Sequence, residues 1–416
     1  MLRVDGGILE RHRPRVAFVI QRYGLEVIGG AEQHCRMIAE HLQEHADVTV
    51  FTTCALDGWR WSNSYPPGGT TVRGVRVQRF PVRLQRNKTI IKLVLAATRI
   101  PGARRLAYAL RPIADGPFTP ALVHHLSIVR KQFDVFVFFC YNFFPTQIGI
   151  HTVPDRAILV PVAHDVPRLI EPPAQKVFAA ARRILANTPE EADLIRARIY
   201  PAPRDISVVG CGVDPPPCVF TGSSNTVPQR PYVLTLARSK PGLEDIRRLI
   251  VAFRARYASA RFSDDIGRTF EGRELQYLLV GDTSFSRWPS VAGLRTAGPV
   301  SELEKWELLR NALVVVNPSL YESLSLVLLE AWTCERPTLV TAGSNVLVGQ
   351  TARSGGGMCF QDPASFAETL SQLLRSAEAR RRLGTHGREW VRQTYDWSVV
   401  IGGYKAAIDH VMGNDL

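Results

Sequence analysis

The chain lacks any long hydrophobic segment and any recognisable export signal. In its 416 residues, no apolar run approaches the ~18 residues that a membrane-spanning helix needs. The start of the chain, up to Pro14, contains no apolar core followed by a small-residue cleavage site. Neither a membrane span nor a signal peptide is therefore predicted, and we expect a cytoplasmic protein.

Cysteine is scarce, and it is not arranged for pairing or for metal binding. The seven cysteines are scattered, odd in number and include no Cys-x-x-Cys pair. This usage is typical of small buried side chains in a reducing compartment. The adjacent His124 and His125 have no further ligand residues nearby, so we expect them to be structural. We predict no metal site and no cofactor.

Acidic residues are missing from one long stretch. The net charge is +13, and no Asp or Glu occurs between Asp57 and Asp115, although twelve Lys and Arg do. Within this stretch, residues 90–100 and 104–111 mix apolar and basic side chains. That pattern is typical of a helix lying on an anionic membrane. A solvated basic face explains the charge almost as well, and a lipid-linked or phosphate-bearing acceptor would also suit it.

Nucleic acid is the other polyanion that such a stretch could meet. The base-reading modules are absent, and the aromatic residues near the charge, such as Trp59 and Trp61, have the character of packing residues. We therefore predict no nucleic-acid partner. The membrane hypothesis places the protein peripherally on the inner face of the plasma membrane, through residues 83–111.

The length, and the alternation of apolar strands with helical segments, indicate two α/β domains. In the first half, strands are expected at 15–20, 47–52, 74–80, 133–140, 157–161, 183–186 and 206–209, with a helix at 31–45. In the second half, strands are expected at 232–237, 276–281, 313–316 and 337–341, and helices at 243–255, 302–311, 324–332, 364–376 and 397–412. Residues 213–231 contain five prolines and predict a linker. Two Rossmann-like domains facing across a ligand cleft are the economical architecture.

The most informative motif places two carboxylates, Glu322 and Glu330, around an apolar run. The β-branched residues that end at Asn317 predict a buried strand, and the residues after Glu322 favour a buried helix. Glu322 then lies at the mouth of this helix, and Glu330 lies two turns inside it at ~1.5 Å per residue. A carboxylate on an apolar helix needs hydrogen-bond donors, which two sugar hydroxyls or an internal Arg would supply.

Between the two glutamates, the amides of residues 323–327 open a helix N-terminus, where a phosphate would bind. The order of carboxylate, phosphate seat and carboxylate suits a nucleotide sugar; a surface helix with an ordinary solvated Glu is the alternative. With Pro-Ser-Leu-Tyr-Glu before it and Glu-Ala-Trp after it, the segment resembles the Glu-x7-Glu signature of retaining glycosyltransferases of group 1 (family 4).

This resemblance covers nearly the whole chain and implies the α/β fold called GT-B. Residues 1–214 would form an acceptor-binding domain with a basic insert at 83–112, and residues 215–231 the linker. Residues 232–394 would bind the nucleotide sugar. After Tyr395-Asp-Trp, residues 395–416 would form a helix that packs back on the first domain.

The resemblance also implies roles for individual residues near the donor. Glu330 would hold the ribose hydroxyls, and Glu322 the transferred sugar. Arg238 and Lys240 would neutralise the diphosphate in place of a metal, although the family's usual spacing between these two cations is longer than the spacing here. The donor-binding set would be Gly29, Gly30, Glu330, Ser325, Leu326, Val327 and Gly281, and residues 299–304 would face the nucleobase.

On the acceptor side, the resemblance implies that His164 reaches over the transferred sugar, although a lone His is more often structural. Asp165 would orient its imidazole or contact the acceptor. Arg22 would be a further anion contact, and Glu32 would follow the glycine pair towards the acceptor.

The implied reaction is retaining transfer of a hexose from a nucleoside diphosphate sugar to a saccharide or lipid-linked acceptor, in cell-envelope polysaccharide or lipopolysaccharide synthesis. No covalent nucleophile is expected. One alternative is a catalytically silent relative that binds nucleotide or membrane. The other is a different GT-B nucleotide-sugar enzyme such as an epimerase, whose acid and base are not evident in the sequence.

Overall fold

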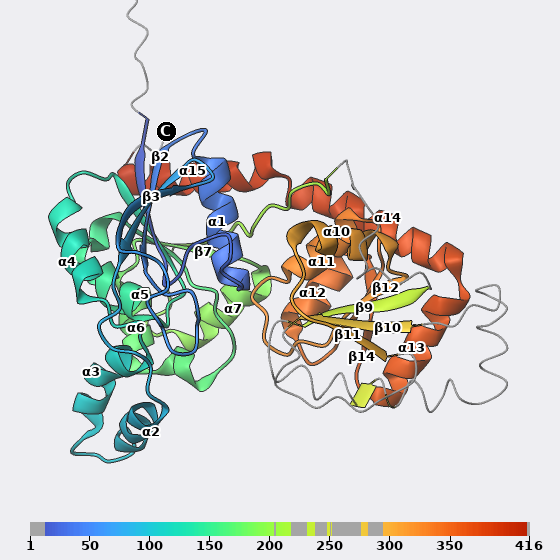
Figure 1. Cartoon of the computed structure of the whole chain (residues 1–416), viewed down its shortest axis with the longest axis horizontal. Helices are drawn as coiled ribbons and strands as arrows, with labels where there is room; N and C mark the ends of the chain where they lie inside the picture. Colours follow the sequence, from blue (N-terminus) through green and yellow to red (C-terminus); the bar gives the residue numbers. More distant parts are fainter. Residues whose placement is uncertain are drawn as a thin grey trace, which may run out of the picture.

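The computed structural model describes residues 13–203, 205–217, 231–237, 248–249, 251, 276–281 and 294–413. They form two sheets, parallel except for the edge strand β3, and each is covered by helices (Figure 1). The first sheet has the order β3-β4-β2-β1-β5-β6-β7-β8, and the second the order β11-β10-β9-β12-β13-β14. This arrangement is the predicted GT-B architecture.

The strands of the first sheet are β1 Arg15–Val19, β2 Asp47–Thr53, β3 Gly68–Val72, β4 Val75–Phe80, β5 Val135–Phe139, β6 Ala157–Val160, β7 Arg183–Ala186 and β8 Ile206–Val208. Their helices are α1 Gly30–Leu42, α2 Lys88–Ala97, α3 Arg104–Asp115, α4 Pro120–Val129, α5 Phe144–Gly149, α6 Pro172–Ala180 and α7 Pro189–Arg198. The central strand β5 is buried along its whole length, as its unbroken apolar sequence predicts.

The strands of the second sheet are β9 Tyr232–Ala237, β10 Gln276–Gly281, β11 Leu294–Ala297, β12 Val314–Asn317, β13 Thr338–Thr341 and β14 Gly357–Phe360. Around them lie α10 Glu302–Asn311, α11 Leu326–Thr333, α12 Asn345–Ser354, α13 Pro363–Arg375 and α14 Ala377–Thr394. The predicted linker falls mostly outside the described residues, and so does the helix expected at 243–255.

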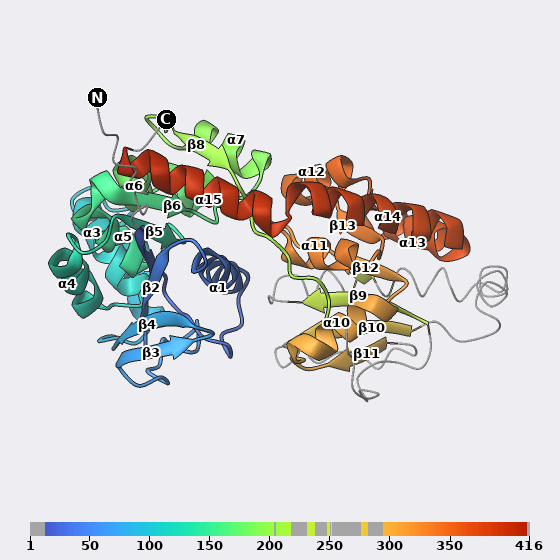
Figure 2. The same ribbon diagram turned by 90° about the horizontal axis from the view of Figure 1, so that it is seen from above.

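The last helix, α15 Trp397–Met412, has the predicted bounds and packs on the first sheet against α1, β5 and β6 (Figure 2). At its start, Trp397 Nε1 donates to Asp214 Oδ1 at 2.8 Å, and its ring stacks on His41 at 3.7 Å between centroids. The predicted return of the chain to the first domain is therefore confirmed.

Three strands of the described residues were not predicted, namely β3, β11 and β14. For β3 the structure gives a physical reason. β3 pairs antiparallel with β4 through a turn in which Arg73 and Gly74 have positive φ. Because most of this edge strand is exposed, it carries no apolar alternation. The expected strand at 74–80 is thus only the second half of a hairpin.

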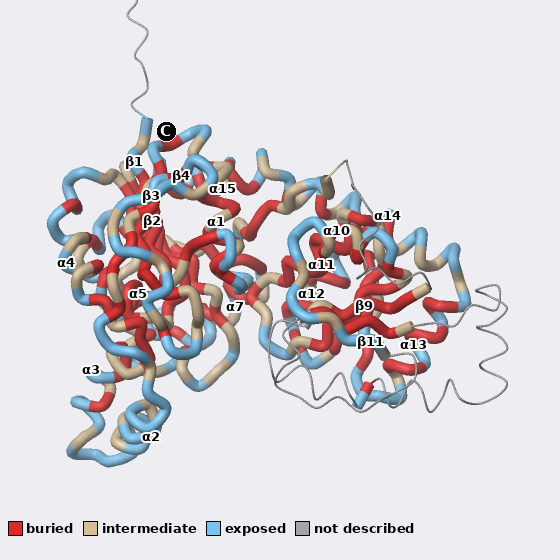
Figure 3. The backbone as a smooth tube through the Cα atoms, in the orientation of Figure 1, coloured by how far each residue is buried: buried red, intermediate tan, exposed pale blue. Residues whose placement is uncertain are grey.

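Helices α2 and α3 pack on each other at one end of the first domain, where α3 also contacts α5 and α6 (Figure 1). No residue of α2 is buried, and its tube in Figure 3 has only the colours of exposed and intermediate residues. We call residues 83–115 the basic hairpin.

Two helical glycines provide a matched test of the packing. A Cβ at Gly384 of α14 would collide with the Glu335 carbonyl oxygen, whereas a Cβ at Gly402 of α15 would meet nothing within 4 Å. We expect Gly384→Ala to lower the free energy of unfolding by about 1–3 kcal/mol. Gly402→Ala should raise it by ~0.5–1 kcal/mol, because alanine favours the helix. Urea unfolding followed by circular dichroism measures both, and equal effects would contradict this packing.

Candidate functional site

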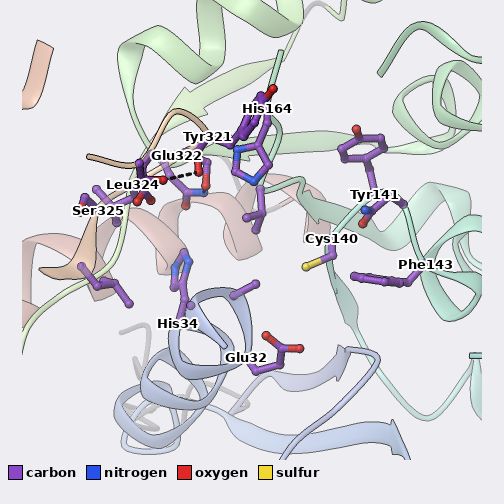
Figure 4. Close-up of a pocket in the computed structure, with 18 of the residues that line it drawn as sticks. Glu32, His34, Cys140, Tyr141, Phe143, His164, Tyr321, Glu322, Leu324 and Ser325 are labelled. Carbon is purple, nitrogen blue, oxygen red and sulfur yellow. Dashed lines mark hydrogen bonds between the residues drawn. The ribbon is translucent and has the colours of Figure 1, made fainter. Parts of the chain in front are cut away.

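A central pocket of about 530 Å³ lies between the two domains. Its walls come from segments that follow β1, β5, β6, β7 and β12, so it lies at the carboxyl ends of the strands of both sheets. Figure 4 shows His164 beside Glu322 at one end, with Glu32 and His34 on α1 across from them. This is where open α/β sheets bind their ligands.

Glu322 lies in the loop between β12 and α11 and lines the pocket, as predicted. The loop is held from inside by Asn317, whose Nδ2 donates to Ser325 Oγ at 2.9 Å and to Glu322 Oε1 at 3.4 Å. Because Asn317 is the last residue of β12, the sheet itself fixes the position of this carboxylate.

The N-terminus of α11 faces the same pocket. Ser325, Leu326 and Val327 all line it. The amide of Ser325, which was expected to bind phosphate, already donates to Gln350 Oε1 at 3.0 Å. Of the three residues expected to bind phosphate through their amides, Leu326 and Val327 remain with amides that no intrahelical acceptor can reach, because they begin the helix.

Glu330 is buried on α11, as predicted, with 3% of its surface exposed. Its cation is Lys305 rather than an Arg. The Lys305 Nζ atom lies 2.7 Å from Glu330 Oε1, and Gln33 Nε2 of α1 donates to the same oxygen at 3.4 Å. Glu330 Oε2 is buried and has no hydrogen-bond partner in the described parts of the chain.

A second pocket of about 370 Å³ lies next to this ion pair. Gly29, Gln33 and Arg36 line it from the first domain, and Lys305 lines it from the second. Residues 299–302, part of the segment expected to face a nucleobase, line it too. Gly281 ends β10, directly after the lining residue Val280, whereas Arg238 and Lys240 lie outside the described residues.

His164 lines the central pocket, and its ring hydrogen-bonds the main chain of Glu322. Burial lowers the pKa of His164 below its usual value, although the bond to Glu322 opposes this shift. The Nδ1 atom is buried and has no partner within the described ranges. Asp165 does not orient this ring; it accepts from Arg198 at 3.0 Å instead.

The glycine turn at the start of α1 carries an ion pair that was not predicted. Arg22 donates to Glu32 Oε1 from Nη2 at 2.6 Å and from Nε at 2.9 Å, and Gln21 donates to the same oxygen. The guanidinium of Arg22, which was expected to contact an anion of the ligand, is therefore already paired with the Glu32 carboxylate. A Cβ at Gly29 would meet the Glu32 carboxylate, so a larger residue there would displace that side chain. Gly30 follows Gly29 and lines the central pocket.

Direct hydrogen bonds join the two domains beside the pocket. Thr188 Oγ1 donates to the Ser323 carbonyl at 3.1 Å, and Asn187 Nδ2 to Ser323 Oγ at 3.3 Å. Arg353 Nη2 pairs with Glu190 Oε2 at 3.0 Å. The loop that presents Glu322 is thus fixed to the first domain.

Sequence reasoning missed several residues of this site, namely Lys305, Gln350, Asn187, Glu191 and Arg168. Each acts through a partner far away in the chain, so no local pattern marks it. Glu191, for example, accepts from the amides of Ala163 and Asn187 and so supports the His164 loop. Burial raises the pKa of Glu191 to about 8. Only Thr188, which caps α7 before Pro189, carried a signal for a helix start.

The stability of the pocket should depend on pH through His34. Burial lowers the pKa of His34 to about 4 from the usual 6.5. As the pH falls, His34 takes up a proton in the unfolded chain before it does so in the folded protein. The contribution of neutral, buried His34 to the free energy of unfolding is therefore complete above pH 6.5 and is lost as the pH falls towards 4. We expect the loss to reach about 3 kcal/mol over that interval.

Replacing His34 by Gln keeps a donor for the Gly210 carbonyl, which His34 Nε2 faces at 3.2 Å, but removes the titration. Thermal unfolding of both proteins between pH 7 and pH 5 measures the difference. Equal pH slopes would contradict the assignment.

Parts of the sequence match known proteins. Residues 231–376 match the family model described as glycosyl transferases group 1. A curated relative, D-inositol 3-phosphate glycosyltransferase of Frankia alni, is 27% identical over 58% of this chain and 63% of its own length. The chain thus spans less than two thirds of that relative.

Two solved structures share the fold over nearly all of the chain. Sucrose-phosphate synthase from Thermosynechococcus elongatus has a TM-score of 0.68 at 16% identity and covers 97% of this chain and 100% of its own. Anabaena Alr3699/HepE, solved in complex with UDP and glucose, has a TM-score of 0.63 at 12% identity and covers 96% and 100%. At these identities the likeness concerns the fold alone.

Proposed function

We propose that this chain, a group 1 glycosyltransferase of GT-B fold, is a retaining hexosyltransferase that uses a nucleoside diphosphate sugar. The observation that carries the proposal is the α11 segment. It presents Glu322 and the helix N-terminus to the central pocket and holds Glu330 two turns deeper. The acceptor is a saccharide or a lipid-linked saccharide, in polysaccharide or lipopolysaccharide synthesis of the cell envelope.

The donor phosphates lie at the N-terminus of α11, on the amides of Leu326 and Val327. Aligned peptide dipoles favour an anion there. Gln350 holds the Ser325 amide and so fixes the first turn. Arg238 and Lys240 supply the cations that neutralise the leaving diphosphate, without a metal. Within the described residues, no cluster of three His, Cys, Asp or Glu side chains suits a metal ion.

The ribose lies between the two pockets, against Glu330. Lys305 provides the counter-charge that makes this buried carboxylate tolerable. Only one carboxylate oxygen is used by Lys305 and Gln33, so Oε2 is left to accept a ribose hydroxyl. The base then occupies the second pocket, beside residues 299–302.

The hexose lies between His164 and Glu322. Because the ring of His164 hydrogen-bonds the main chain of Glu322, one nitrogen is occupied and Nδ1 faces a sugar hydroxyl. The lowered pKa keeps the imidazole neutral near pH 7, so it adds no positive charge next to the developing oxocarbenium ion.

The bond between the anomeric carbon and the phosphate oxygen breaks first in this mechanism. The acceptor hydroxyl attacks from the same face, and a donor phosphate oxygen takes its proton. The protein provides position and charge stabilisation rather than a nucleophile. On the acceptor side, the Arg22–Glu32 pair and Arg168 form the wall of the pocket.

The donor site predicts a clear result for Glu330→Ala. Slow hydrolysis of UDP-, GDP-, ADP- and dTDP-sugars by the purified protein should release one nucleoside diphosphate selectively. In Glu330→Ala this release should fall by about 10- to 100-fold, because a hydrogen bond to a charged group is lost. Isothermal titration with the matching nucleoside diphosphate measures the same loss in affinity.

Glu335→Ala is the matched control, because this partly exposed carboxylate pairs with Arg388 and lines neither pocket. A protein that binds a nucleotide but never turns it over would favour the silent relative. Release of an epimerised sugar would favour an epimerase.

Stereochemistry and metal dependence form a separate prediction. With an α-linked donor, proton NMR of the first product should show an α-linkage, because attack occurs on the face that the diphosphate leaves. Excess EDTA should leave the rate within about twofold, because cationic side chains replace a metal at the diphosphate. A β-linked product would contradict retention, and rescue of a chelated enzyme by Mg²⁺ would contradict metal independence.

A further inference from the structure

The basic hairpin carries large apolar side chains that are exposed to solvent instead of being buried in the domain. Leu93 and Leu106 are 65% and 64% exposed, although both lie within helices. The same surface carries five further large apolar residues that are at least 37% exposed, namely Leu84, Ile90, Leu95, Ile100 and Leu110. Large apolar side chains left exposed in such number on one pair of helices mark an interaction site.

The same surface is positively charged. Six basic side chains of the hairpin are exposed, namely Arg83, Lys88, Lys92, Arg99, Arg104 and Arg105. The one acidic residue of the hairpin, Asp115, is buried and pairs with Arg111 at 2.7 Å. No exposed carboxylate of the hairpin therefore offsets the exposed charge.

The base of the hairpin is tied to the wall of the central pocket. Arg111 is buried at the end of α3 and also faces Glu171 at 3.5 Å. Arg168, which lines the central pocket, pairs with the same Asp115. A surface bound by α2 and α3 is thereby held at a fixed place relative to the acceptor end of the pocket.

We propose that the basic hairpin docks the protein on an anionic lipid bilayer, with its exposed leucines and isoleucines in the interface and its Lys and Arg on the headgroups. Exposed aliphatic side chains between basic ones match a bilayer surface, which offers both chemistries. A second copy of the chain would bring like charge against like charge. A nucleic acid would leave the aliphatic side chains in water.

Vesicle sedimentation of the full chain tests the proposal. The protein is spun with neutral phosphatidylcholine vesicles and with vesicles containing a third phosphatidylglycerol, at 0.1 M and 0.5 M salt. We expect binding to the anionic vesicles only, and weaker binding at the higher salt concentration.

Two variants separate charge from apolar insertion. Each basic residue near an anionic surface contributes about fivefold to partitioning, so Lys92→Ala with Arg99→Ala should weaken binding about 25-fold. Leu93→Ser should weaken it at least about tenfold. The matched controls, Arg381→Ala with Arg382→Ala on α14 and Ile128→Ser on α4, change equally exposed residues elsewhere and should bind like the parent protein.

The proposal is overturned if the protein ignores anionic vesicles, if it binds neutral ones equally, or if the control variants lose as much binding as the hairpin variants. Binding of an oligonucleotide without binding of vesicles would assign the surface to nucleic acid instead. Circular dichroism confirms that each variant is folded. Donor hydrolysis without vesicles should stay at the parent rate, so a failed docking test leaves the proposed function standing.

Discussion

The buried ion pair of Lys305 and Glu330 is the interaction on which the second domain and its site depend. A carboxylate inside an apolar helix costs several kcal/mol unless it is compensated. The ammonium of α10, 2.7 Å away, supplies that compensation, so α11 can be buried with a charge on it. The same helix begins at the central pocket, and it therefore carries the buried carboxylate and the open amides as one rigid unit.

The first domain completes this unit from the other side. Gln33 of α1 reaches Glu330, and residues at the start of α7 hold the loop that carries Glu322. Helix α15 then crosses from the second domain and packs on α1. The site is therefore shared by both domains, and an opening of the cleft would separate His164 from Glu322. In the proposed reaction, such a coupling of closure to site assembly would exclude water from the donor.

The sequence predicted the elements whose signal is local. Helix α15 and strand β9 have the expected bounds because their apolar pattern and end residues are local signals. The burial of Glu330 was also predictable, because its neighbours are apolar. Its partner was not, since Lys305 is 25 residues away and its own sequence surroundings are those of a surface helix. The Arg22–Glu32 pair was missed for the same reason. Its two charges neutralise each other at the pocket wall, where a free cation was expected.

Charge alone left a solvated face as almost as good an explanation of the basic stretch as a docking surface, because both require only exposed Lys and Arg. Burial separates the two. A solvated helix normally hides its apolar face against the domain, but α2 has no buried residue and projects Leu93 into solvent. Exposed apolar side chains are unfavourable in water. They become favourable only when another surface covers them. Because the hairpin is anchored through Asp115 to Arg168 at the pocket wall, a bilayer that covered it would lie at a fixed place relative to the central pocket.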